Sequence, residues 1–115
     1  MSDAYTQLTK ELSTSIAGIR KDIPGVMQGF SSMAGAALED GALSKKTKEL
    51  IALSIGVATH CKGCIGFHIK ALIALGVTRE ELAETLGMAI YMGGGPSLMY
   101  AAEAMQAFEE FSEKS

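Results

Sequence analysis

Glycine and proline residues interrupt this sequence at intervals that leave only helix-sized segments between them. Within the segments, apolar residues recur about every three or four positions, and no stretch alternates apolar and polar residues as a half-buried strand does. Leu8, Leu12, Ile16 and Ile19, for example, fall on one face of a helix. The pattern predicts an all-α fold.

The length of the chain and its short connections limit how these helices are arranged. A chain of 115 residues suits one domain, because a second domain would leave each hydrophobic core too small to be stable. Short turns between successive helices favour antiparallel neighbours. We therefore predict a single domain over residues 1–115, built as an antiparallel bundle of about six helices.

Local signals for helix starts and stops set the expected boundaries. Pro24 suits the first turn of a helix, Ser44 can cap a helix, and Gly76 can end one in the left-handed conformation. Thr78 and Glu81 have the spacing of a capping box. The predicted helices span residues 3–21, 24–39, 45–59, 60–75 (opening within 60–63), 79–92 and 96–113.

The composition bears on assembly and on partners. Hydrophobic residues make up 48% of the chain and the mean hydropathy is +0.22, so we expect some apolar surface to lie between the subunits of a homo-oligomer. Met88, Met92, Met99 and Met105 fall at helical spacing and are expected in packing or subunit contacts. The net charge is -3, and no basic patch or row of aromatic residues predicts a nucleic-acid partner.

Two features bear on membranes and on the cellular compartment. The chain begins with a polar segment that lacks the basic start and apolar core of a signal peptide. No charged residue lies between Glu84 and Glu103, but the three glycines and the proline at 93–96 would break a membrane-spanning helix in its middle. We expect two helices joined by a tight turn, no membrane association and a cytoplasmic location.

The only two cysteines, Cys61 and Cys64, are separated by two residues at the predicted start of a helix. This spacing brings the sulfur atoms within reach of a disulfide, and a helix N-terminus favours the reactive thiolate. In a reducing compartment such a pair is more often catalytic or metal-binding than structural. His68 follows one turn after Cys64 on the same face, where its imidazole can take a proton from sulfur.

Glu49 lies on the preceding predicted helix and is a less obvious candidate. On one straight helix it would be about 18 Å from Cys61, at about 1.5 Å per residue. If the chain reverses within 60–63, the two helices run back to back, with Gly56 allowing a close approach. Glu49 then comes to the level of His68, where a carboxylate could orient the imidazole and raise its basicity.

Glu49, Cys61, Cys64 and His68 match the pattern E-x11-C-x2-C-x3-H, and the segments LSKKTKELIAL, GVTREEL and YMGGGPSLMYAA surround them. Over residues 41–110 the chain resembles the AhpD-like alkylhydroperoxidases of the carboxymuconolactone decarboxylase superfamily. The resemblance implies an all-helical fold, a homo-oligomer (a trimer or hexamer) and an oxidoreductase that reduces hydroperoxides without a cofactor.

By the same resemblance, Cys64 attacks the hydroperoxide substrate and becomes a sulfenic acid, Cys61 resolves it to a disulfide, and an external dithiol reduces that disulfide. Some members carry a second histidine just before the second cysteine; this chain has Gly63 there, and His60 before the pair instead. The site is therefore predicted more firmly than the rate of peroxide reduction. Decarboxylases of the superfamily lack the cysteine pair, so decarboxylation is not expected.

Other interpretations of the site stay open. A disulfide oxidoreductase acting on proteins or small molecules would use the same two cysteines. A non-catalytic redox-sensing or metal-binding oligomer would use His60, Cys61, Cys64 and His68, although four ligands on one short helical stretch do not easily close a tetrahedron. A helical scaffold could carry the same residues as a vestigial site.

Overall fold

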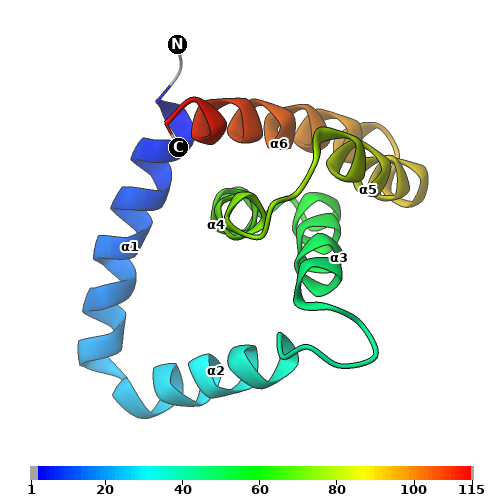
Figure 1. Ribbon diagram of the computed structural model, residues 1–115. Coiled ribbons are helices and arrows are strands. Elements are labelled where there is room, and N and C mark those ends of the chain that lie inside the picture. Colours follow the sequence, from blue (N-terminus) through cyan, green and yellow to red (C-terminus); the bar gives the residue numbers. More distant parts are fainter. Residues whose placement is uncertain (1–2, 115) are drawn as a thin grey trace.

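The computed structural model describes residues 3–114, which form six helices and no strand (Figure 1). The all-α architecture is thereby confirmed, and the predicted helix boundaries agree with the observed ones to within two residues. The helices are α1 (Ala4–Asp22), α2 (Pro24–Ala37), α3 (Lys45–Ala58), α4 (Lys62–Ala74), α5 (Arg79–Gly93) and α6 (Gly95–Glu113).

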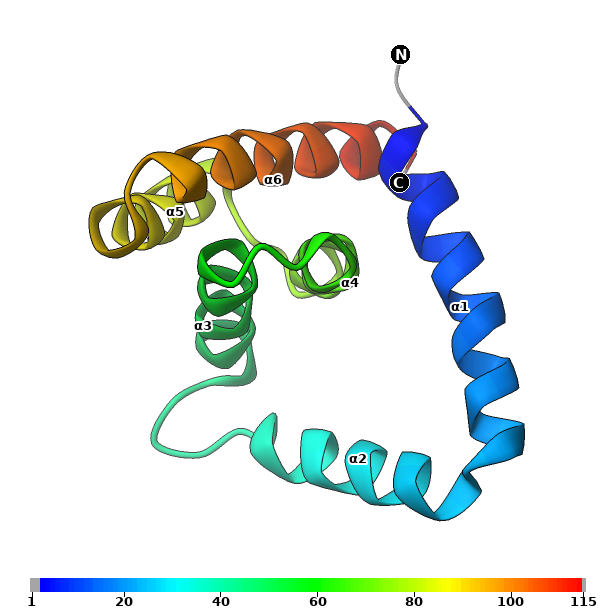
Figure 2. The ribbon, with the colours of Figure 1, turned by 180° about the vertical axis from the view of Figure 1, so that it is seen from behind.

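The central helix of the fold is α4. It packs against α1, α3 and α6, and both views of the ribbon show these helices around it (Figures 1 and 2). Its fully buried side chains Ile65, Ile69 and Leu72 join Leu53 and Val57 of α3 in the hydrophobic core. Full burial of an aliphatic side chain of this size contributes about 1.5–3 kcal/mol. The core therefore holds the cysteine-bearing helix firmly in place.

Local capping contacts explain why the helix boundaries could be predicted. The Ser44 hydroxyl accepts a hydrogen bond from the Thr47 N–H at the start of α3. Thr78 and Glu81 form the predicted capping box at the start of α5. Gly76 follows α4 with φ +78°, in the left-handed region that favours glycine. All of these contacts join residues close in sequence.

The uncharged stretch between Glu84 and Glu103 is divided between two helices, as predicted. A single residue, Gly94 with φ +75°, separates α5 from α6. Because this backbone conformation carries a steric cost for residues with a Cβ atom, the tight turn depends on glycine. Within residues 3–114, no helix combines the length and the apolar character that crossing a membrane requires.

Three of the methionines at helical spacing are exposed. Met88, Met92 and Met99 present 59%, 76% and 60% of their surface to solvent, whereas Met105 is partly buried against the core. Packing within the chain therefore does not account for the first three. Their role in subunit contacts stays a prediction.

The helix α2 stands away from the core and departs from the predicted antiparallel packing. It is joined to α1 at an elbow and lies well apart from α4 in both views (Figures 1 and 2). None of its residues is buried in the described chain, and Val26 and Phe30 are exposed. A cavity of about 770 Å³ lies between α1 and α2. The link consists of Ile23 alone, followed by Pro24, which is too short for α2 to fold back along α1.

A buried carboxylate from the far end of the chain caps α1. Glu110 of α6 accepts hydrogen bonds from the N–H groups of Tyr5 (3.2 Å) and Thr6 (2.5 Å) and from the Thr6 hydroxyl (2.7 Å). Asp3, the N-cap residue of α1, makes no side-chain capping bond. Burial raises the pKa of the Glu110 carboxyl, but the hydrogen bonds from Thr6 and Tyr5 outweigh burial and hold this pKa below its ordinary value of 4.5.

We predict that Glu110→Gln lowers the free energy of unfolding by about 1–3 kcal/mol near pH 7, because an amide NH₂ would face N–H donors of α1. Since the pKa of Glu110 is lower in the folded state, its stabilisation is present above about pH 4.5 and is lost as the pH falls through the folded pKa. The difference from wild type is therefore expected to shrink at about pH 3.

Chemical denaturation at both pH values measures this difference. The exposed Glu84→Gln, which removes a carboxylate from the surface of α5, is the matched control. Equal stability of the two variants near pH 7 would show that Glu110 does not anchor α1.

Candidate active site

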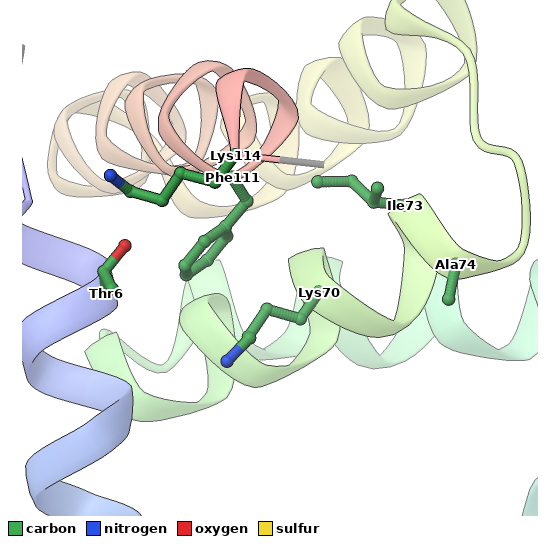
Figure 3. Close-up of a pocket in the computed structure, with 6 residues that line it drawn as sticks. All are labelled: Thr6, Lys70, Ile73, Ala74, Phe111 and Lys114. Carbon is green, nitrogen blue, oxygen red and sulfur yellow. The ribbon is translucent and has the colours of Figure 1, made fainter.

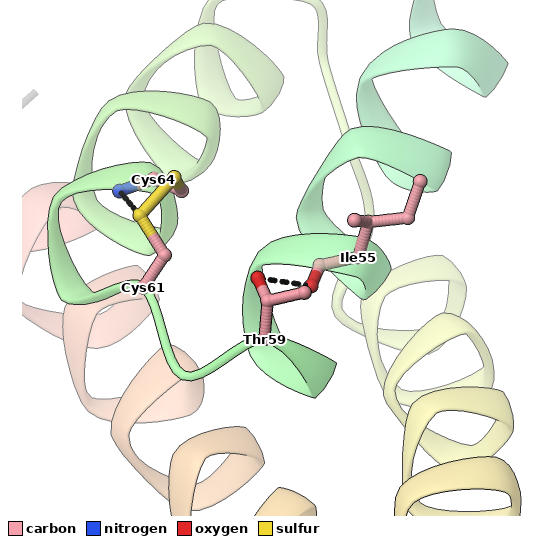
Figure 4. The surroundings of a disulfide bond; sticks show 4 residues. All are labelled: Ile55, Thr59, Cys61 and Cys64. Atoms are coloured by element: carbon pink, nitrogen blue, oxygen red, sulfur yellow. Dashed lines mark hydrogen bonds between the residues drawn. A yellow bond between two sulfur atoms is a disulfide. The ribbon is translucent and has the colours of Figure 1, made fainter.

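The chain reverses sharply between α3 and α4. His60 adopts φ +61°, which is uncommon for a residue other than glycine, and the Cys61 N–H donates to the Gly56 carbonyl over 2.9 Å. The Thr59 hydroxyl donates to the Ile55 carbonyl at the end of α3 (Figure 4). The chain therefore does reverse here, which was the condition for bringing Glu49 to the level of His68, and α3 and α4 pack directly against each other.

Cys61 is the N-cap residue of α4. Its sulfur accepts a hydrogen bond of 3.1 Å from the Cys64 N–H, in the position that a serine or aspartate oxygen takes in an ordinary N-cap (Figure 4). The two sulfur atoms form a disulfide, and the Cα atoms are 5.2 Å apart. The N-cap and first turn of α4 thus contain both sulfur atoms and the N–H group that donates to one of them.

Gly56 permits the close contact between α3 and the cysteine pair. A Cβ atom at this position would lie 3.0 Å from the Cys64 Cβ, closer than ordinary carbon–carbon contact. Gly56 is buried, so no other part of the chain could move aside at little cost. The predicted role of Gly56 in helix approach is confirmed.

Glu49 and His68 meet across the interface between α3 and α4. The Nδ1 atom of His68 lies 2.6 Å from Oε1 of Glu49. The Glu49 side chain is 5% exposed and that of His68 is 30% exposed, so the carboxylate is shielded from water while the imidazole reaches solvent. A carboxylate can only accept, so Nδ1 carries the proton and Nε2 is left to act as a base.

Positions 63 and 60, where this chain differs from some AhpD-like proteins, each make a contact with another helix. At Gly63, an added Cβ would lie 2.9 Å from Cδ1 of Leu12, so α1 covers the place that a histidine side chain would need. His60 stacks its ring on Tyr100 of α6, with centroids 4.7 Å apart and planes 5° from parallel. His60 is therefore held against α6.

Three residues beside the cysteine pair were not identified from the sequence. Lys62, between the cysteines, lies 3.4 Å from the carboxylate of Glu103, and the same carboxylate accepts a 2.8 Å hydrogen bond from the Tyr5 hydroxyl. Burial, followed by the bond to Glu103, raises the pKa of Tyr5 far above its ordinary value, so this hydroxyl stays a donor. Only the position of Lys62 inside the CxxC motif could have pointed to this cluster.

A cavity of about 360 Å³ opens beside His68 and is almost wholly apolar. Lys48 and His68 are the two lining residues with polar side chains. Its other walls come from α2 and α3, in Ala34, Ala37, Leu38, Ile51, Ala52 and Ile55.

A second cavity, of about 560 Å³, lies at the opposite end of α4 from the cysteines. There the ring of Phe111 lies between Lys70 and Lys114 (Figure 3), and Lys70 Nζ is 5.4 Å from the ring centroid. This cavity contains neither cysteine nor histidine. Within residues 3–114, no three His, Cys, Asp or Glu side chains gather in a group that could hold a metal ion.

A family model matches most of the chain that carries these residues. The model of the carboxymuconolactone decarboxylase family matches residues 24–107. The chain belongs to the carboxymuconolactone decarboxylase family. The resemblance seen in the sequence motifs is thereby confirmed.

Solved structures and sequence relatives agree with this family assignment. The crystal structure of a family member from Legionella pneumophila is 64% identical, with a TM-score of 0.95, and the match covers 96% of this chain and 99% of that one. A family member from Thermotoga maritima, for which involvement in the antioxidative response is suggested, is 30% identical with a TM-score of 0.72, over 76% of this chain and 91% of its own. An uncharacterized protein of Cupriavidus necator is 38% identical over 108 residues, 94% of this chain and 95% of its own.

Gly56→Ala tests the close contact on which the site depends. We expect it to lower the free energy of unfolding by about 1–3 kcal/mol, because the new methyl group must push α3 away from Cys64. Gly87→Ala in α5 is the control, since a Cβ there meets nothing within 4 Å, and it is expected to stabilise the protein by about 0.5–1 kcal/mol. Urea unfolding measures both changes. A gain of stability in both variants would contradict the contact.

Proposed function

We propose that this protein is a thiol-dependent peroxidase in which the Cys61–Cys64 pair reduces a hydroperoxide. The observation that carries the proposal is the bond between Glu49 and His68, with His68 one helical turn after Cys64 on α4. A buried carboxylate that holds a histidine by Nδ1 leaves Nε2 as a base, which is the group that a thiol needs to become a nucleophile.

In the proposed cycle, Nε2 of His68 takes the proton of the Cys64 thiol, one helical turn away on α4. The thiolate attacks the terminal oxygen of the hydroperoxide, the O–O bond breaks, and two electrons pass from sulfur to the peroxide. The leaving alkoxide takes the proton from the imidazolium and departs as an alcohol. Cys64 is left as a sulfenic acid.

Cys61 then resolves the sulfenic acid. Its sulfur, which in the disulfide accepts the Cys64 N–H, lies at the positive end of the α4 dipole, and both features favour the thiolate once the disulfide is reduced. It attacks the Cys64 sulfur, the disulfide forms, and hydroxide leaves as water with the proton that Cys61 gave up. An external dithiol reduces the disulfide and is itself oxidised to a disulfide, which completes the cycle without a cofactor.

The cavity beside His68 supports an organic hydroperoxide as the substrate. Its walls are aliphatic side chains of α2 and α3, which suit an apolar substituent better than hydrogen peroxide alone. The suggested antioxidative involvement of the Thermotoga maritima relative fits the same reaction. We place this reaction in the cytoplasm, where a dithiol reductant is available.

A homo-oligomer, a trimer or hexamer, is part of the proposal. Members of the family are often oligomeric. The exposed apolar side chains of α2 and of the α5–α6 turn, such as Phe30 and Met92, supply surface that a second copy would cover.

The second candidate is a general disulfide oxidoreductase, which the position of Cys61 favours. A thiolate at the N-cap of a helix can attack a disulfide as well as a sulfenic acid. Exchange with a disulfide needs no peroxide. The two candidates differ in which oxidant the reduced protein consumes. A peroxidase reacts quickly with hydroperoxides, whereas an oxidoreductase prefers a disulfide.

We predict that one equivalent of cumene hydroperoxide removes two hydrogen atoms from the reduced protein, because the two thiols become one disulfide. Cys61→Ser is expected to gain one oxygen atom as a trapped Cys64 sulfenic acid, and Cys64→Ser to gain none. Mass spectrometry of the intact chains measures all three. Thiols that persist in the wild type would overturn the proposed function, and a sulfenic acid in Cys64→Ser would assign the attack to Cys61.

Glu49→Gln is predicted to slow oxidation of the thiols by about ten-fold, because a neutral amide orients His68 but no longer supports its positive charge. The rate of thiol loss in excess hydroperoxide is measured across the pH range, together with the exposed Glu84→Gln as the control. Unchanged rates at every pH would remove Glu49 from the reaction.

A further inference from the structure

Two residues of α6, one helical turn apart, hold the segment on either side of Cys61. The Tyr100 ring stacks on His60, which precedes the cysteine, and the Glu103 carboxylate pairs with Lys62, which follows it. His60 is the only residue other than glycine with positive φ within residues 3–114, so the segment has an uncommon backbone conformation just before Cys61. The contacts from α6 keep the N-cap sulfur in its position.

The contact between Lys62 and Glu103 also affects the charge around the sulfur atoms. Lys62 is the first residue of α4, directly after the N-cap, and its side chain is 56% exposed. The flexible Lys62 ammonium can pair with either of two anions, the Glu103 carboxylate or, after reduction, the Cys61 thiolate. The Tyr5 hydroxyl donates to Glu103 from a position that is 5% exposed, and this bond fixes the carboxylate.

We propose that Glu103 is a positioning residue that sets the reduction potential of the Cys61–Cys64 disulfide by drawing the Lys62 ammonium away from the thiolate. Because the reduced state of the pair contains the thiolate, a cation close to sulfur stabilises the reduced state and makes the disulfide more oxidising. Glu103 opposes this effect and keeps the disulfide less oxidising. The inference rests on the redox role given to the cysteine pair in the proposed function.

Equilibration with glutathione measures the effect without any peroxide. In this reaction two glutathione molecules reduce the Cys61–Cys64 disulfide to two thiols and become one glutathione disulfide. Glu103→Gln frees Lys62 and removes a negative charge near sulfur, so we expect it to shift the equilibrium about three-fold toward the dithiol. Lys62→Gln leaves the carboxylate without its cation, so a shift of about the same size toward the disulfide is expected.

The opposite signs separate this charge effect from a structural role. Loss of order would move both variants in the same direction, and glutamine at 103 still accepts the Tyr5 hydrogen bond. The rate of alkylation by iodoacetamide near pH 7 should rise in Glu103→Gln and fall in Lys62→Gln, because the thiolate fraction changes in the same sense. The double variant should return close to the wild type.

Glu109→Gln is the matched control, because it breaks the exposed pair of Glu109 with Arg79 on the same helix. It is expected to leave both the glutathione equilibrium and the alkylation rate unchanged. This inference alone would be overturned if the wild-type disulfide forms reversibly but the Glu103 and Lys62 variants shift the glutathione equilibrium in the same direction or not at all. A wild type that forms no reversible disulfide would overturn the proposed function as well.

Discussion

The close antiparallel contact between α3 and α4 is the constraint on which the rest of the structure depends. It exists because Gly56 lacks a Cβ atom where Cys64 needs the space, and because the chain reverses within a few residues at His60. The same contact brings Glu49 to His68, although the two are 19 residues apart in sequence. A carboxylate that would otherwise be solvated at the surface becomes a buried acceptor, and the imidazole gains a defined tautomer.

Helices α1, α5 and α6 pack around α3 and α4 and hold them in place. α6 contacts the residues that flank the first cysteine, and it also caps α1 through the carboxylate of Glu110. α1 in turn packs closely on α4: a Cβ atom added at Gly63 would lie 2.9 Å from Cδ1 of Leu12, and one added at Gly66 would lie 2.7 Å from Cγ2 of Thr9. A side chain at either position would therefore require α1 side chains to shift. α2 contributes least to this support, since none of its residues is buried within the described chain.

Contacts between residues close in sequence could be predicted from the sequence, whereas most contacts between distant residues could not. The caps at Ser44 and Thr78 involve partners three residues away, so their motifs predict them directly. Glu49 could be placed because a helical rise and one assumed reversal locate it opposite His68. The capping of α1 by Glu110 could not, because it joins residues more than a hundred positions apart and replaces a local cap that the sequence does not supply. Helical periodicity likewise says which face of α2 is apolar, but not what covers it.

Because Cys61 caps α4, the redox state of the cysteine pair is linked to the stability of the first turn of α4. The sulfur that accepts the Cys64 N–H is bonded sulfur in one state and thiol or thiolate in the other, and these differ in strength as acceptors. By thermodynamic linkage, a state that caps α4 better is also the state that the folded protein favours over the unfolded chain. Each cycle of the proposed reaction would then slightly tighten and loosen the first turn of the central helix. A substitution anywhere in the core that changes the stability of this turn would shift the thiol–disulfide balance without contact with either sulfur.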